Sequence, residues 1–388
     1  MTNNGGSSPF SLGIVGDCSS AKAHAHLLAC GMDGRWSLDA GVFGGDRAQT
    51  EAMATRWQVS ADRAYATWRD LVLAERSRLD AVAVLAPGAE GYEIIQNLLK
   101  AGMPVIAENP LATGLNDARL LLAMHEPSKN FVAVTSDYGG YPLIRELRAR
   151  IAAGQFGNVQ QLHIEIAEDT LVRRSADLDP AALHDEFIPG ICLDKGLQLH
   201  HLVAFLCAEQ ADQINAEFST YSRHRNIVDN VSLWAAYPSG MSACFWLSQT
   251  AAGRGDGLRI RLYGELGSAE WCEREPDRLR IVNVTGADFN IGRGGQALLA
   301  GEARYSRVAG THASGFVEAF ANVYTDIADA LCAWRRDGKH NNAYVPGLQD
   351  ATAGLAMFHA ARLSSSRRRW ERIQVSAPQE RLAGRFRS

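Results

Sequence analysis

The sequence predicts two domains: a parallel α/β domain, followed by an α+β domain with an open, largely antiparallel sheet. Three observations predict this. The chain has 388 residues, more than one hydrophobic core usually contains. Residues 11–136 alternate short apolar runs with helical segments, as parallel sheets with helical crossovers do. After about residue 155 the segments become longer and alternate apolar with polar residues, which indicates antiparallel strands.

Each strand expected in the first domain is a short apolar run followed by a turn or a helix. The expected strands are 11–16, 38–43, 79–86, 103–110 and 131–137. The helices expected between them are 20–31, 46–57 and 91–102, and Gly102 closes the last of these.

The second domain is expected to contain strands with period-two alternation. They are 159–169, 214–222, 230–240, 241–250, 257–271 and 279–284, with glycine turns at 238–240 and 264–267. A helix over 195–207 is expected between the first two strands. Two closing helices, 313–336 and 347–365, are expected to pack on the first domain.

Composition excludes several classes of partner. The formal net charge of -4 does not favour nucleic acid or an anionic membrane. No apolar run reaches the length of a membrane helix, and residues 1–10 lack the features of a signal peptide. Seven scattered cysteines without C-x-x-C spacing predict neither a disulfide framework nor a metal site, so we expect a cytoplasmic protein.

The stretch GIVGDCSSAKAHAH, residues 13–26, resembles the turn that opens a dinucleotide-binding domain. The three positions of G-x-G-x-x-G hold Gly16, Cys18 and Ala21. At the second glycine position, the Cys18 side chain is expected to push phosphates outward. Two readings of Cys18 stay open: a structural residue filling an unused pocket, or a thiol whose pKa the helix N-terminus lowers.

Four longer stretches carry a resemblance that covers about residues 11–365. They are AGMPVIAENPLATG, GICLDKGLQLHHLVAFL, GTHASGFVEAFANVY and the junction at 137–165. In these the chain resembles a divergent member of the Gfo/Idh/MocA (glucose–fructose oxidoreductase / inositol dehydrogenase) family.

The resemblance implies a domain organisation and an activity. It implies a dinucleotide-binding domain at 11–140 and a substrate and oligomerisation domain at 141–365, and composition adds a flexible tail at 1–10 and a basic arm at 366–388. It also implies hydride transfer between NAD or NADP and a hydroxyl-bearing carbon of a small molecule. Relatives of this kind form homodimers or homotetramers through the open sheet face, and we expect the same here.

The family's two proton-handling residues are replaced in this chain. The family's E-K-P motif is Glu108-Asn109-Pro110, so Asn109 stands in place of the lysine. In the family's D-x-G-x-H motif Asp194 remains, but Gln198 replaces the histidine. Neither amide titrates. One turn further along the helix, His201 is either a substitute acid or base, or a histidine that bonds a neighbouring backbone group.

The resemblance also assigns binding residues. The cofactor set is Gly16, Cys18, Ser19, Arg47, Pro87 and Glu108, in which Arg47 follows Gly44-Gly45 and could meet a 2′-phosphate. The candidate substrate residues are Tyr138, Tyr141, Asp169, Arg173 and Lys195. Lys195 is a further candidate for the missing lysine.

These residues lead to one preferred function and two alternatives. The preferred function is an NAD(P)-dependent oxidoreductase with atypical catalytic residues, acting on a sugar, a cyclitol or a glycosylated small molecule. The first alternative is a non-redox enzyme, such as a lyase, cyclase or isomerase, with a degenerate cofactor site. The second is a non-catalytic partner subunit.

Overall fold

The structure, a computed structural model, describes residues 8–173, 185–223, 226–294, 298–308, 312–340 and 342–376. The chain forms two compact units. Unit 1 contains Met1–Ala112, Leu121–Gly140 and Gly315–Leu348, and unit 2 contains Thr113–Leu120, Tyr141–Ser314 and Gln349–Ser388. The chain therefore leaves and re-enters each unit, whereas the expected domains are contiguous.

Unit 1 contains a five-stranded sheet in the order β2-β1-β3-β4-β5, and all its neighbouring strands are parallel. Its strands are β1 Phe10–Val15, β2 Trp36–Val42, β3 Ala81–Val84, β4 Val105–Ala107 and β5 Val132–Val134. The parallel α/β prediction for this part of the chain is confirmed.

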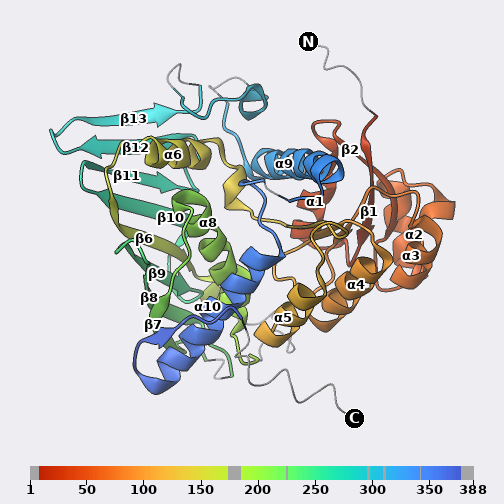
Figure 1. The fold of residues 1–388 in the computed structure, drawn as a ribbon, viewed down its shortest axis with the longest axis horizontal. Helices are drawn as coiled ribbons and strands as arrows, with labels where there is room; N and C mark the ends of the chain where they lie inside the picture. Colours follow the sequence, from red (N-terminus) through yellow and green to blue (C-terminus); the bar gives the residue numbers. More distant parts are fainter. Residues whose placement is uncertain are drawn as a thin grey trace. The chain divides into compact units, whose positions relative to one another are not determined.

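The helices of unit 1 include two that the sequence patterns did not predict, α3 and α5. They are α1 Ala21–Gly31, α2 Arg47–Arg56, α3 Trp68–Glu75, α4 Gly88–Ala101, α5 Leu115–Met124, whose first residues belong to unit 2, and α9 Phe316–Asp337. Figure 1 shows α9 beside α1, and the two helices share one hydrophobic core. A Cβ on Gly140 would lie 2.0 Å from the Ala319 carbonyl oxygen, so α9 lies almost against the short 3₁₀ helix Tyr138–Gly140.

Unit 2 contains a nine-stranded sheet in the order β13-β12-β11-β10-β6-β9-β8-β7-β14. Its strands are β6 Val159–Glu168, β7 Gln213–Ser219, β8 Asn230–Ala236, β9 Ser242–Ser248, β10 Gly255–Gly264, β11 Gly267–Cys272, β12 Arg278–Asn283, β13 Asp288–Gly292 and β14 Glu371–Arg372. Only the β6–β9 pair is parallel among these strands, which confirms a largely antiparallel sheet.

The helices of unit 2 cover one face of this sheet (Figure 1). They are α6 Pro142–Ala152, α7 Thr170–Arg173, a π-helical turn Cys192–Gly196 that continues into α8 Leu197–Cys207, and α10 Leu348–Arg367. The closing helix α10 lies in unit 2, not with the first domain as expected, and Ser364 accepts a hydrogen bond at 3.0 Å from the Ala216 amide of β7.

The opposite face of the sheet, which we call the open face, carries alternate residues of the same strands. In β8, Val231, Leu233 and Ala235 are buried, whereas Trp234 is 43% exposed. His163 of β6 lies between the rings of Trp234 and Tyr263, at centroid distances of 6.0 and 5.7 Å. The open face therefore has an aromatic patch, made of His163, Trp234 and Tyr263.

Both expected terminal segments lie partly outside the described residues, which exclude 1–7 and 377–388. The start of the expected basic arm is built into unit 2. β14 pairs with β7, and the Arg119 guanidinium donates to the Gln374 and Val375 carbonyl oxygens at 2.6 and 2.9 Å. Residues 371–375 therefore belong to the fold and not to a solvated arm.

We predict that Gly196→Ala destabilises unit 2. The new Cβ would lie 2.4 Å from the ring of Phe358, whose side chain is fully buried on α10. Overpacking of this kind costs about 1–3 kcal/mol, measured as the free energy of unfolding in denaturant. Gly31→Ala is the control, because nothing lies within 4 Å of its Cβ.

Phe358→Leu should recover part of the stability that Gly196→Ala loses, because the smaller side chain vacates the contested space. A Gly196→Ala variant as stable as the parent would contradict this packing.

Candidate functional site

A sharp turn follows β1 where the order of the parallel sheet reverses, between β2 and β3. Gly16 has a φ of +145°, and a Cβ there would lie 2.8 Å from the backbone nitrogen of Ala86. The Gly16 amide donates to the Val42 carbonyl at 3.0 Å. Ligands of open α/β sheets bind at such a switch point, outside the carboxyl ends of the strands. This turn is therefore the place in unit 1 where a ligand is expected.

The Cys18 side chain faces the core of unit 1. It is fully buried within the hydrophobic cluster, and its Sγ lies 3.6 Å from the Gly16 carbonyl oxygen. Burial, together with the Asp17 carboxylate, raises the pKa of the Cys18 thiol to about 12. The reading of Cys18 as a thiol of lowered pKa is wrong. The crowding expected on the outside of the turn is also absent, because the side chain points inward.

Exposed polar residues form the outer side of the turn. The Ser20 hydroxyl accepts from the Ala23 amide at 3.1 Å and caps α1. The Ser19 amide and hydroxyl both donate to the Asp17 carboxylate at 2.9 Å. The predicted cofactor residue Ser19 therefore lies at the N-terminus of α1, where an anion is favoured, with Asp17 already on its donors.

The end of β2 gives Arg47 a local partner. Asp46 caps α2 by accepting from the Gln49 amide at 2.8 Å, and Arg47 pairs with Glu51 at 2.7 Å. The Arg47 side chain is 82% exposed. The Arg47 guanidinium remains accessible to a phosphate, although the Glu51 carboxylate competes with the phosphate for it.

Three charged side chains meet at the carboxyl ends of β4 and β5. Lys22, from the first turn of α1, contacts the Glu108 carboxylate and lies 3.1 Å from Asp137 Oδ2. Both carboxylates are about 15% exposed, and the Lys22 side chain is 34% exposed. We call this group the lysine–carboxylate cluster. Sequence reasoning assigned Glu108 but missed Lys22 and Asp137.

The surroundings within the cluster shift the pKa values of its two carboxyl groups in opposite directions. Burial raises the pKa of Glu108, but Lys22 and His26 outweigh it and hold that pKa at about 2. Burial raises the pKa of Asp137 and the Glu108 charge adds to this, against the opposing effect of Lys22. Burial lowers the pKa of Lys22, but the two carboxylates outweigh it and raise that pKa. Asp137 is therefore the member that takes up a proton most readily.

A histidine supports Glu108 from the core side. His26 Nε2 lies 2.8 Å from Glu108 Oε2, and its Nδ1 lies 2.8 Å from the Tyr324 hydroxyl of α9. Thr135 also donates to Glu108 Oε2 at 2.5 Å. The other histidine of α1, His24, lies instead beside the Trp57 ring. From the sequence alone, it is not possible to tell which of two histidines two residues apart on a helix faces the strands.

Three more predicted residues lie around the same strand ends of unit 1. Asn109 follows Glu108 and is 5% exposed, and its Nδ2 has no hydrogen-bond partner among the described residues. Pro87 occupies the N-cap position of α4. Tyr138 is 9% exposed. The buried Asn109 amide is a donor available to a ligand.

In unit 2, the π-helical turn before α8 changes which side chains share an environment. Gln198 and His201 of α8 are 3% and 2% exposed, whereas the Asp194 side chain is 61% exposed. In a regular helix from Asp194, the spacing i, i+4 and i+7 would put Asp194, Gln198 and His201 on one face, but the wider π turn breaks that regularity. Gln198 and His201 remain together, without Asp194.

His201 is buried without a hydrogen bond. Within the described part of the chain, neither ring nitrogen has a partner, so the alternative of a backbone-bonded histidine is not observed. Burial, with a further effect of His200, lowers the pKa of His201 to about 3. His200 itself packs on α10, with Nδ1 3.3 Å from Met357 Sδ. His201 is therefore a neutral imidazole at pH 7.

The remaining predicted residues of unit 2 have structural neighbours of their own. Lys195 lies 3.3 Å from Glu168 and 3.6 Å from Asp194. Asp169 accepts from the Gly253 amide at 3.1 Å, and Tyr141 is buried against the ring of Trp271 at 5.2 Å. Arg173 ends α7, and its side chain lies outside the described residues.

Two further findings concern metal ions and membranes. Among the described residues, no three His, Cys, Asp or Glu side chains are placed to hold a metal ion. None of the helices described has the length and hydrophobicity needed to cross a membrane.

Comparisons with known proteins match both parts of the chain. A family model described as "Oxidoreductase family, NAD-binding Rossmann fold" matches residues 10–136. A second, "GFO/IDH/MocA C-terminal domain", matches residues 144–270. The uncharacterized oxidoreductase YfiI of Bacillus subtilis is 27% identical over 348 residues, which are 82% of this chain and 85% of YfiI.

Solved structures share the fold. An oxidoreductase from Pseudomonas syringae matches with a TM-score of 0.84 at 25% identity, covering 94% of this chain and 99% of that one. An inositol dehydrogenase homolog from Azotobacter vinelandii, complexed with NADH and myo-inositol, matches with a TM-score of 0.85 at 24% identity, covering 94% and 97%. The chain belongs to the GFO/IDH/MocA family of oxidoreductases, and its first part is the family's NAD-binding Rossmann domain.

Proposed function

We propose that this protein is an NAD-dependent dehydrogenase that oxidises or reduces a carbinol carbon of a sugar, a cyclitol or a glycosylated small molecule. The similarity to an inositol dehydrogenase homolog complexed with NADH and myo-inositol supports the substrate class. The family membership supports the cofactor.

The observation that most supports this proposal is the orientation of the Cys18 side chain, which leaves the outside of the turn open to a pyrophosphate. Had this side chain filled the outside of the turn, it would have occupied the approach to a pyrophosphate. It is instead fully buried, and Gly16 keeps the positive φ that the turn requires. The N-terminus of α1, capped by Ser20, then offers the partial positive charge that a pyrophosphate needs. The residues present therefore fit the dinucleotide.

Four of the cofactor residues expected from the sequence, Gly16, Ser19, Pro87 and Arg47, remain our proposals for contact with the dinucleotide, whereas Cys18 faces the core and Glu108 pairs with Lys22. The Gly16 turn and Ser19 would hold the pyrophosphate, Pro87 would lie beside the nicotinamide half, and Arg47 would lie near the adenosine ribose. When bound, the nicotinamide gives or accepts the hydride.

The proton needs a separate carrier. Oxidation of a carbinol removes a hydride from the carbon and a proton from its hydroxyl. We assign this proton to the Asp137 carboxylate, because its raised pKa brings it nearer to neutral pH than Glu108. Lys22 holds Asp137 in place, with its Nζ 3.1 Å from Asp137 Oδ2. It also supplies an ammonium group, which the chain lacks at position 109 because Asn109 replaces the lysine there. Lys22 is thus a positioning residue for Asp137.

Asn109, Gln198 and His201 then act as hydrogen-bonding groups toward the substrate. Two of them, Asn109 and His201, have buried nitrogens without partners among the described residues. A buried donor left unpaired costs about 1–3 kcal/mol, and a substrate hydroxyl would remove that cost. Asp194 and Lys195, with the candidates Tyr138, Tyr141, Asp169 and Arg173, remain proposals for substrate contact.

We also propose that the chain forms a homodimer or homotetramer through the open face. In the aromatic patch, Trp234 is 43% exposed and Tyr263 is 41% exposed. Aromatic side chains of this kind are enriched at protein interfaces.

All seven cysteines are free, which favours a reducing compartment such as the cytoplasm.

We predict that the purified protein binds NADH with micromolar affinity, measured by nicotinamide fluorescence, with NADPH titrated in parallel. Cys18→Ala should change the dissociation constant less than about threefold, because this side chain faces the core. Gly16→Ala should abolish binding, since a Cβ there meets backbone at 2.8 Å. Failure of both dinucleotides to bind at millimolar concentration would contradict the proposed function.

We predict that Asp137→Asn lowers kcat for NAD+-dependent oxidation of the accepted substrate by about 10²–10⁴-fold. Substrate screening begins with myo-inositol. Activity of the parent enzyme should rise with pH as Asp137 ionises, and the variant should lack this rise. Lys22→Met should move it to higher pH, because removing the ammonium raises the pKa of Asp137 further.

His201→Ala provides the comparison for these variants. It should weaken kcat/KM without moving the pH profile, since burial lowers the pKa of His201 to about 3. If the pH dependence of activity changed in His201→Ala but not in Asp137→Asn, His201 and not Asp137 would be the proton carrier.

We predict that Trp234→Asp converts the oligomer to monomers in sedimentation velocity. Leu73→Asp is the matched control, because Leu73 is 87% exposed on α3 in unit 1. A parent protein that already sediments as a monomer would exclude the oligomer.

A further inference from the structure

A cavity of about 280 Å³ lies in unit 2, between the start of α5, the C-terminal half of α10 and strand β14. We call it the α5–α10 pocket. Four apolar residues, three arginines, a histidine, a glutamate and a glutamine line it. Its size is near the lower end of the range for small-molecule sites, about 300–1,000 Å³, so its ligand must be small. None of the lining residues is among those proposed for the dinucleotide or the substrate.

The buried part of the pocket is apolar. Ala356 and Ala360 lie one turn apart on the same side of α10, and they are 1% and 3% exposed. Leu115 of α5 and Leu363 of α10 complete this wall of the pocket. The short alanine side chains leave space that larger residues on α10 would fill. The wall therefore favours the apolar body of a ligand over a hydrated ion.

Arg119 of α5 brings a positive charge to the pocket, and none of the described carboxylates compensates it. Its Nε and Nη2 donate to the carbonyl oxygens of Val375 and Gln374 at 2.9 and 2.6 Å. Within the described part of the chain, its Nη1 has no hydrogen-bond partner and its guanidinium forms no ion pair. Burial lowers the pKa of Arg119, with no neighbouring carboxylate to oppose this effect. A half-buried cation of this kind favours an anion as its partner.

Two more arginines lie at the exposed edge of the pocket. Arg367 pairs with Glu371 at 3.1 Å, and the same carboxylate lies 2.8 Å from Arg369. Arg372 is exposed and has no ion pair among the described residues. Three guanidinium groups therefore line the pocket together with one carboxylate, which is already shared. This excess of positive charge, in a chain of formal net charge -4, favours a negatively charged ligand.

His359 contributes a hydrogen-bonding group without a charge. Its ring lies 4.6 Å from the ring of Phe187, centroid to centroid. Burial, with a further effect of Arg119, lowers the pKa of His359, so the imidazole is neutral at pH 7. Among the described residues, neither ring nitrogen has a hydrogen-bond partner. One nitrogen of a neutral imidazole donates, so His359 and Arg119 together offer donors to a carboxylate.

We propose that the α5–α10 pocket binds a small organic carboxylate with an aromatic or aliphatic body. Its carboxylate interacts with Arg119 and His359, while Arg372 adds charge at the edge. Its body lies against Ala356 and Ala360. A phosphate dianion fits less well, because its additional oxygens would lose water without further donors in the buried part of the pocket that the structure describes. The ligand is an effector or a stabilising molecule and takes no part in the proposed hydride transfer.

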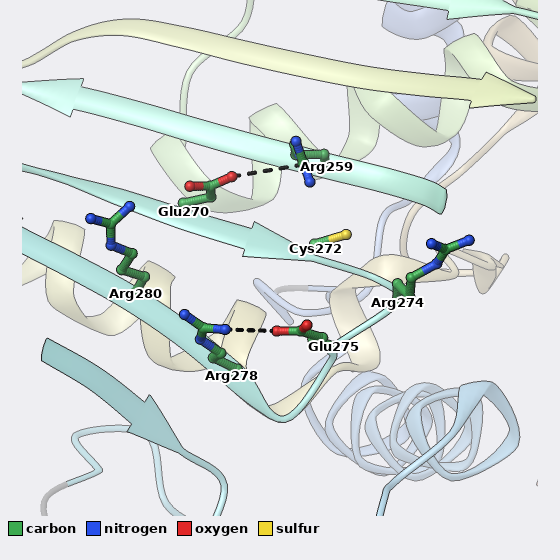
Figure 2. A pocket seen from close by; sticks show the side chains of 7 residues that line it. All are labelled: Arg259, Glu270, Cys272, Arg274, Glu275, Arg278 and Arg280. Carbon is green, nitrogen blue, oxygen red and sulfur yellow. Dashed lines mark hydrogen bonds and ion pairs between the residues drawn. The ribbon is translucent and has the colours of Figure 1, made fainter. Parts of the chain in front are cut away.

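A second cavity of unit 2 has a different lining and serves as the comparison (Figure 2). It lies on the open face, because its residues on β11 and β12 alternate with the buried Trp271 and Leu279. All its lining residues except Cys272 are charged, and Arg278 pairs with Glu275 at 3.0 Å (Figure 2). Without an apolar wall, this cavity should not favour an organic carboxylate.

The test measures binding of benzoate to the full chain by calorimetry, with ionic strength held constant by sodium chloride. We expect saturable binding with a Kd of about 1 mM or below. Benzyl alcohol keeps the ring without the charge, and acetate keeps the charge without the ring. Each should bind at least about tenfold more weakly than benzoate, because each loses one half of the proposed contacts.

Two arginine variants locate the binding site. Arg119→Gln should raise the Kd for benzoate at least about tenfold, because it removes the half-buried cation. Since Arg119 also holds Gln374 and Val375, Arg372→Gln provides a second variant that leaves those contacts intact. The Arg372 side chain is exposed, so we expect a smaller rise of the Kd, about two- to fivefold.

Two controls separate this site from the others. Arg280→Gln removes an arginine of the open-face cavity that pairs with Asp288, and it should leave benzoate binding unchanged. Saturating NADH should also leave benzoate binding unchanged, so the outcome does not depend on the dehydrogenase proposal.

Several results would overturn the proposal. These are the absence of saturable benzoate binding, a Kd that neither folded arginine variant raises, and benzoate binding that NADH removes. Benzyl alcohol or acetate binding as tightly as benzoate would show that the pocket does not recognise charge and apolar body together. Inorganic phosphate binding more tightly than benzoate would exclude the carboxylate class.

Discussion

One ammonium group, that of Lys22, balances two buried carboxylates at the carboxyl edge of the parallel sheet. Charges removed from water are tolerated only when paired and hydrogen-bonded, and losing one partner of such a group typically costs about 3–5 kcal/mol. The cluster joins the first turn of α1 to the ends of β4 and β5, and His26 extends it to Tyr324 of α9. It therefore fixes the elements around the dinucleotide turn relative to one another within unit 1.

The same balance gives the two carboxyl groups different chemistry. Glu108 accepts from His26, Thr135 and Lys22, so its charged form is favoured. Asp137 bears the cost of burial next to that charge, so its neutral form becomes accessible. Two titratable groups whose surroundings push their pKa values apart are a recurring basis for acid–base catalysis. Asn109 and Gln198 stand where the resemblance implies a titrating lysine and histidine, and we propose the lysine–carboxylate cluster as the source of proton chemistry in their place.

Much of the fold could be predicted because apolar periodicity reports burial directly. The strand–helix alternation of residues 11–136 and the period-two strands after residue 155 both predicted their sheets. Side-chain direction could not be read in the same way. Cys18 occupies a glycine position in the motif, yet whether its side chain faces outward or into the core depends on the packing of α1 and β2. Lys22 reaches residues 86 and 115 positions away in sequence, and no local pattern encodes such a contact. The π turn before α8 likewise displaced Asp194 from the face expected of a regular helix.

The protonation of the lysine–carboxylate cluster is the most direct test of this account. Carboxyl carbon NMR, followed as a function of pH in the parent protein and in Lys22→Met, reports each group separately. The account predicts that Glu108 stays ionised down to about pH 2, that Asp137 titrates above the ordinary range of an aspartate, and that Lys22→Met raises the Asp137 pKa further. Titration of both carboxyl groups at ordinary values, unchanged by Lys22→Met, would contradict it.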